Sequence, residues 1–236
     1  MKLIRLSLLL IVLVSCNNNK EPMGKVYHNG ALRTLMKGDL NTVVQLDSLK
    51  GKDNLYALGA ASNLKGEIQI FNGSPVNARV ENEKIIIDSS FDESASLLVY
   101  AQIPVWTEIT IPASVKTKVA LEEFIQVSAM NKGLDMGRPF PFLVEGEISS
   151  LDWHVIDWPE GDTLHTHEKH RNSGLNGTIK EKEVEIIGFF SLHHKTVFTH
   201  HSTNIHIHFK TEDRSLAGHV DDLQLGNDTK LKLPKK

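Results

Sequence analysis

Residues 204–209 of the chain read Asn204-Ile205-His206-Ile207-His208-Phe209, a strict alternation of polar and apolar side chains. In a β-strand, alternate side chains point to opposite faces of the sheet. His206 and His208 therefore share one face, about 7 Å apart by the rise per residue, while the apolar residues pack into the core. Two imidazoles at this spacing can converge on one metal ion.

A third histidine follows eleven residues after His208, in Ala217-Gly218-His219, where Gly218 permits a close turn. Three neutral imidazoles suit Zn²⁺, and a fourth position left open for substrate or water is the arrangement of a catalytic zinc site. Iron(II), copper, nickel or manganese fit such ligands less exclusively. The alternative is structural, with hydrogen bonds satisfying two strand histidines and a turn histidine.

The rest of the sequence predicts many short strands and few helices. Helices are expected over residues 27–36, 43–49 and 118–130, and strands over 66–71, 84–88, 97–103, 106–111, 142–148, 183–190, 204–210 and 230–233. Residues 158–177 are polar and rich in histidine and glycine, which favours a loop. This pattern indicates an α+β fold, mostly β, with mixed or antiparallel sheets and a few helices.

The N-terminus has the features of a bacterial lipoprotein signal. Lys2 and Arg5 precede an apolar run that is too short to cross a bilayer, and Cys16 follows Leu13-Val14-Ser15. We expect cleavage before Cys16 and its lipidation, whereas an ordinary signal peptide would leave Cys16 unmodified. The expected segments are a signal peptide (1–15), a lipidated tether (16–24) and a metal-binding domain (25–236).

Composition limits the partners. The formal charge of −3 gives no basic surface suited to nucleic acid. No second apolar run could cross a membrane, so we expect membrane attachment by the lipid anchor only, on the periplasmic or cell-surface side of a bacterial membrane. The single cysteine excludes an internal disulfide. Ten of the twelve histidines lie between His165 and His219, and this concentration indicates a chemical role for the segment.

The histidine segment continues as Asp213-Arg214 and then Ala217-Gly218-His219-Val220. It resembles the zinc-binding motif of the α-acetolactate decarboxylase family, which reads His-x-His-Phe, an Asp-Arg pair and Gly-Gly-His-Val, with the same spacing between the second and third histidines. Weaker resemblances cover nearly all of the mature chain, at residues 27–38, 58–68, 141–150 and 188–189. An acetolactate decarboxylase-like fold is therefore expected.

The resemblance implies an activity. Members of the family decarboxylate acetolactate, a 2-hydroxy-3-keto acid, to acetoin, and their metal acts as a Lewis acid that stabilises the enediolate left by loss of carbon dioxide. By this resemblance His206, His208 and His219 are the metal ligands. Glu67 is the acid/base residue that protonates carbon. The alternative for Glu67 is a solvated glutamate at a strand end.

Two departures from the family pattern concern the substrate. The family holds the substrate carboxylate with an arginine, and His154 stands at that position here. His154, the second candidate catalytic residue, can pair with a carboxylate only when protonated. The family also has a longer C-terminal tail that contributes a second glutamate, for which we expect no counterpart.

Two histidine-rich segments, 165–171 and 199–201, have no counterpart in the family motif. They could line the pocket and, with Arg171, bind an anionic substrate; they could bind a second ion; or they could form a solvated loop. The favoured interpretation is a zinc-dependent carboxy-lyase acting on a small anionic keto acid, with a homodimer as one option for assembly. The alternative is a non-catalytic zinc-binding or zinc-sensing lipoprotein on the same fold.

Overall fold

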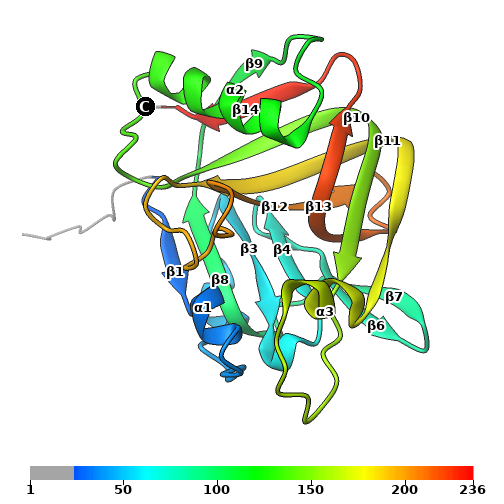
Figure 1. Ribbon diagram of the computed structural model, residues 1–236. Coiled ribbons are helices and arrows are strands. Elements are labelled where there is room, and N and C mark those ends of the chain that lie inside the picture. The colour runs from blue at the N-terminus through cyan, green and yellow to red at the C-terminus, as the bar shows by residue number, and fades with distance from the viewer. Residues whose placement is uncertain (1–23, 236) are drawn as a thin grey trace, which may run out of the picture.

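The computed structural model describes residues 24–235, and their strands form two antiparallel sheets (Figure 1). The predicted signal peptide and Cys16 lie outside the described residues. The first sheet contains β1 (Tyr27–Asn29), β2 (Val44–Gln45), β3 (Leu55–Ala61), β4 (Glu67–Phe71), β5 (Ser74–Pro75), β6 (Asn77–Glu81), β7 (Lys84–Asp88) and β8 (Ser94–Gln102). Its order is β1-β8-β3-β4-β6-β7, with β2 beside β8 and β5 beside β4.

The second sheet has six strands. They are β9 (Trp106–Thr110), β10 (Phe140–Val155), β11 (Leu175–Phe190), β12 (Ile205–Thr211), β13 (Ala217–Leu225) and β14 (Lys230–Pro234). The order is β11-β12-β13-β10-β14-β9, and β11 also pairs with β10. Strands β10 to β13 therefore form a closed circuit of antiparallel pairs, which fixes the positions of the histidines on β12 and β13.

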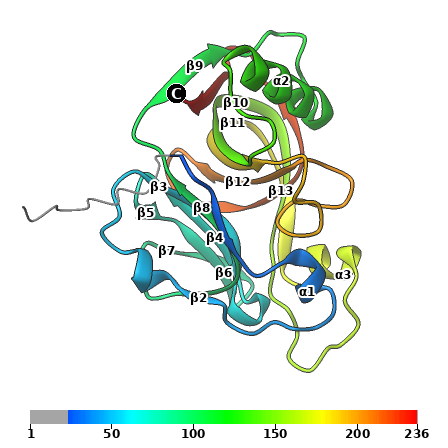
Figure 2. The same cartoon turned by 90° about the vertical axis from the view of Figure 1, so that its left-hand side faces the viewer.

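The described helices are α1 (Leu32–Leu35), α2 (Lys118–Asn131) and α3 (His167–Asn172), with 3₁₀ turns at Leu46–Leu49 and Ser62–Leu64. Helix α2 begins at an N-cap, where the Thr117 side chain accepts a hydrogen bond from the backbone N–H of Ala120. Its buried Leu121 and Ile125 pack into the core of the second sheet, which α2 covers in Figure 2. No helix among residues 24–235 is long and apolar enough to cross a membrane.

The two sheets share a hydrophobic core. Leu58, Phe71 and Val99 of the first sheet belong to the same buried cluster as Ile187 and Phe189 of the second. Burial of such side chains stabilises the packing by about 1.5–3 kcal/mol each. The contact brings β4 of the first sheet against the face of β12 and β13 that carries the histidines.

The predicted fold class is confirmed, because the chain is mostly antiparallel strand with few helices. Three local predictions were wrong. The predicted helix over residues 43–49 is reduced to the 3₁₀ turn at Leu46–Leu49, because Val44–Gln45 pair with β8 as strand β2. The predicted helix over residues 27–36 is reduced to α1, because residues 27–29 pair with the edge of β8 instead. The predicted loop over residues 158–177 contains the short helix α3, whose N-cap Thr166 accepts a hydrogen bond from the backbone N–H of Lys169.

Candidate metal centre

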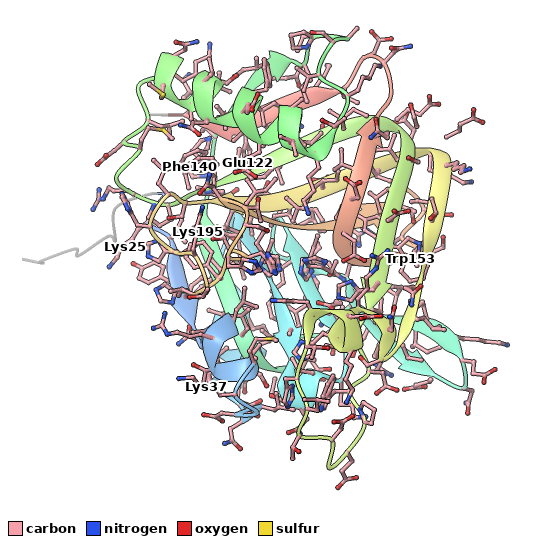
Figure 3. All side chains as sticks on the ribbon, in the orientation of Figure 1. Lys25, Lys37, Glu122, Phe140, Trp153 and Lys195 are labelled. Atoms are coloured by element: carbon pink, nitrogen blue, oxygen red, sulfur yellow. The ribbon has the colours of Figure 1, made fainter. Side chains whose placement is uncertain are left out.

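The three predicted ligand histidines lie together on two paired strands. His206 and His208 share one face of β12, and His208 stands directly opposite His219 of β13. Their ring centroids are 5.0 Å (His206 to His208), 5.2 Å (His206 to His219) and 5.4 Å (His208 to His219) apart. Figure 3 shows side chains with ring nitrogens gathered where the two sheets meet.

The expectation that Gly218 forms a turn was wrong, because Gly218 lies inside β13. Gly218 instead allows β13 and β10 to approach each other closely. A Cβ atom at this position would lie 2.7 Å from the backbone oxygen of His154 on β10. The missing side chain therefore lets β10 and β13 come close enough to bring His154 next to His219, with ring centroids 4.7 Å apart.

A buried glutamine orients His208. The Nδ1 atom of His208 lies 3.0 Å from Oε1 of Gln69, whose side-chain amide donates to the backbone oxygen of Val76. Because Gln69 presents its oxygen, His208 carries its proton on Nδ1 and leaves Nε2 free. That Nε2 lies 3.2 Å from Nε2 of His206.

The solvated alternative for Glu67 was wrong. Glu67 is buried, with 5% of its side chain exposed. Its Oε2 lies 3.7 Å from Nε2 of His208, and its Oε1 lies 3.6 Å from Nε2 of His154. Burial raises the pKa of Glu67 to about 7, against the opposing effects of His154 and of a hydrogen bond from the Ile156 N–H. The carboxyl group thus sits between a predicted ligand and the predicted carboxylate-binding residue.

His154 belongs to a charged network organised by Asp221. Nδ1 of His154 lies 3.0 Å from both carboxylate oxygens of Asp221, while Nε of Arg171 lies 3.3 Å from the same carboxylate and Nδ1 of His219 lies 3.5 Å from it. Burial lowers the pKa of His154, but the hydrogen bond to Asp221 and the charge of Glu67 outweigh this effect and raise it above its ordinary value. His154 is thereby favoured in the protonated form that a substrate carboxylate requires.

Sequence reasoning assigned no role to Asp221 or Gln69. Asp221 follows His219 by two residues on the same strand, so its side chain shares the face of the histidine. The two-residue spacing between His219 and Asp221 could therefore have identified Asp221 from the sequence. No sequence pattern identifies Gln69, because its importance depends on the packing of two sheets whose strands are far apart in sequence.

The two histidine-rich segments separate into different clusters. His165 and His170 contact each other, with Nδ1 and Nε2 2.9 Å apart, and both rings contact Trp158. His167 instead lies against His200 and His201 of the loop between β11 and β12. Burial and neighbouring histidines lower the pKa of His200 to about 4, so its ring is neutral at neutral pH.

The neutral charge of all three histidines, and the spacing of His206 and His208, fit a zinc ion. Burial and neighbouring histidines lower the pKa values of His206 and His208 well below the ordinary range, and burial lowers that of His219 to about 4, so all three rings are neutral. Two nitrogens bound tetrahedrally to one zinc stand about 3.3 Å apart, close to the 3.2 Å between Nε2 of His206 and Nε2 of His208. A tighter set of donors, from His154, His219 and Asp221, shares His219 with this trio.

Fold and site together define a two-sheet α+β protein with a buried cluster of histidines and a carboxyl group. The model of the alpha-acetolactate decarboxylase family matches residues 26–235, and the chain belongs to that family. No protein of curated function matches the chain.

Solved structures show the same fold. A protein of unknown function from Staphylococcus aureus, described as similar to alpha-acetolactate decarboxylase, is 19% identical, with a TM-score of 0.71 over 89% of this chain and 85% of that one. The acetolactate decarboxylase of Bacillus subtilis subspecies spizizenii is 17% identical, with a TM-score of 0.73 over 90% and 86%. That of Bacillus subtilis strain 168 is 15% identical, with a TM-score of 0.71 over 90% and 86%.

Proposed function

We propose that the chain is a zinc-dependent carboxy-lyase that converts acetolactate, or a close 2-hydroxy-3-keto acid, to acetoin or its analogue. The observation that carries this proposal is the position of Glu67. Its buried carboxyl group lies within 4 Å of both His208 and His154. A protein that only stores zinc gains nothing from an acid held beside the ligands, whereas a decarboxylase needs one.

His206, His208 and His219 are the residues that would hold the zinc. A zinc ion bound there would supply Lewis-acid chemistry, drawing electron density from the substrate oxygens as carbon dioxide leaves. Gln69 keeps Nε2 of His208 free for this purpose, through its 3.0 Å contact with Nδ1.

The remaining residues handle the substrate carboxylate and the proton. Protonated His154 binds the carboxylate, and Asp221 holds its ring in place. When the bond to the carboxyl carbon breaks, carbon dioxide departs and the electron pair stays on the substrate. The Glu67 carboxyl group donates its proton to that carbon, and solvent returns the proton.

Replacement of Glu67 tests the assignment. Zinc-loaded wild-type protein should form acetoin from racemic acetolactate well above the spontaneous rate. Glu67→Gln should retain zinc but lose about 10²-fold or more in turnover, because a positioned acid/base group contributes at least that much. The matched control, Glu160→Gln, alters an exposed glutamate and should keep full activity. Acetoin is measured colorimetrically, and zinc by elemental analysis.

Replacement of His154 tests the substrate assignment. His154→Arg restores the group expected from the family, so it should lower KM for acetolactate while leaving zinc content unchanged. If neither the wild-type protein nor His154→Arg forms acetoin above the blank, the decarboxylase proposal fails. A non-catalytic zinc-binding or zinc-sensing lipoprotein would then be the better account.

A further inference from the structure

A second cluster of histidines lies outside the site described above. His167 is the first residue of α3, and His200 and His201 belong to the loop between β11 and β12. Figures 1 and 2 show this helix and this loop on the same side of the molecule. One ring nitrogen from each of the three histidines lies within 4.8 Å of the other two.

The ring nitrogens of the three histidines lie close enough together to share one ion. Nε2 of His200 lies 3.2 Å from Nδ1 and 3.1 Å from Nε2 of His167. The His201 ring lies 4.0 Å from that of His200 and 5.5 Å from that of His167, centroid to centroid. Nδ1 of His200 lies 2.8 Å from the Ser202 hydroxyl and accepts a hydrogen bond from the Ser202 backbone N–H at 3.4 Å, so Ser202 holds the ring in place.

Packing alone does not explain this arrangement. His167 and His201 are exposed, so their contact removes little apolar surface from water. All three donors are imidazoles, and no carboxylate belongs to the group. Imidazoles attract one another weakly, but a shared transition-metal ion gives them a common partner, and three imidazoles with a water suit zinc.

We propose that His167, His200 and His201 form a second divalent transition-metal site, separate from the site of His206, His208 and His219. Its ion ties α3 to the loop that precedes β12. Both segments lead into the first site, because α3 carries Arg171, which contacts Asp221, and because His206 lies on β12. The ion would therefore fix two segments that frame the first site.

Zinc stoichiometry tests the proposal. Full-length protein is stripped with a chelator, titrated with Zn²⁺, freed of unbound ion and assayed for zinc per chain. Wild-type protein should bind two ions, and His167→Ala and His200→Ala should each bind one. The matched control is His193→Ala, which alters an exposed histidine of the same loop and should still bind two.

Variants in each site distinguish metal binding at the first site from metal binding at the second. His208→Ala should bind one ion, and the double variant His208→Ala/His200→Ala should bind none. Co²⁺ bound to His208→Ala protein should give the visible absorption of a low-coordinate cobalt–imidazole site, and His167→Ala should abolish it. Circular dichroism of each variant verifies that the chain is folded.

Two results would overturn the proposal. One is a wild-type stoichiometry of one that His200→Ala leaves unchanged. The other is a stoichiometry of two that persists in both folded variants, His167→Ala and His200→Ala. Retention of all zinc by His208→Ala would instead contradict the proposed function, and it would not bear on the proposal of the second site.

Discussion

At the scale of single residues, Gln69 orients His208, although Gln69 itself is neither a proposed ligand nor a proposed acid/base residue. It is fully buried on β4, and it contacts both His208 and the backbone oxygen of Val76. A buried polar side chain with two partners has little freedom to rotate, because losing a buried hydrogen bond costs about 1–3 kcal/mol. Gln69 thus sets which nitrogen of His208 faces the site.

Replacement of Gln69 should therefore weaken zinc binding without removing a ligand. Gln69→Leu keeps the approximate volume but leaves the Nδ1 proton of His208 without an acceptor. We expect zinc affinity to fall by about 10–100-fold, the usual effect of losing such a partner of a ligand histidine. Competition with a chelator of known affinity measures it. Gln102→Leu, which removes only an exposed hydrogen bond to the Asp53 carbonyl, should bind zinc as the wild type does.

The sequence predicted the histidines but not the residues that orient them. His206 and His208 could be identified from the sequence because the period of a strand places both on one face. The network of His154, Asp221 and Arg171 depends on the pairing of β10 with β13 and on the position of α3, which no local pattern reveals. The role of Glu67 came from the family resemblance, and its burial came only from the structure.

At the scale of elements, the spacing of β10 and β13 determines whether His154 can reach His219. Gly218 is the point of closest approach, and the atom that a Cβ would meet is a backbone oxygen, which cannot rotate away. Two other strands, β11 and β12, confine the same pair, because β10, β11, β12 and β13 close on one another. The strands therefore cannot separate locally without disturbing the whole circuit.

Gly218→Ala should consequently destabilise the protein and disturb the metal site together. We expect the free energy of unfolding to fall by about 1–3 kcal/mol, the usual cost of overpacking, and zinc affinity to fall with it. Urea unfolding of zinc-free protein measures the first effect. Gly137→Ala is the control, because its Cβ would meet only the side-chain oxygen of exposed Asp135. Equal stability of the two variants would contradict this account of Gly218.

Element boundaries were predictable where one periodic pattern dominated. Helix α2 was predicted over residues 118–130 and extends over Lys118–Asn131, because its buried residues recur at helical spacing. Strands β3, β6 and β13 were missed. β3 is buried along nearly its whole length, so it has no alternation of polar and apolar residues to detect. β13 begins with Ala217-Gly218, which favoured a turn.

At the scale of the whole molecule, the first site depends on both sheets. The proposed ligand histidines come from β12 and β13, whereas Glu67 and Gln69 come from β4. The second cluster joins a helix to a loop on the side of the molecule. A change that loosens the contact between the sheets should therefore affect the first cluster more than the second.

The last prediction concerns the attachment of the whole molecule to a membrane. We expect the wild-type protein to fractionate with membranes and to incorporate a labelled fatty acid. Cys16→Ala should lose the label and should not mature normally, because Cys16 is the only thiol in the chain. Asn18→Ala, two residues further on, is the control and should behave as the wild type. Equal and fully soluble recovery of the wild-type and Cys16→Ala proteins would exclude lipidation.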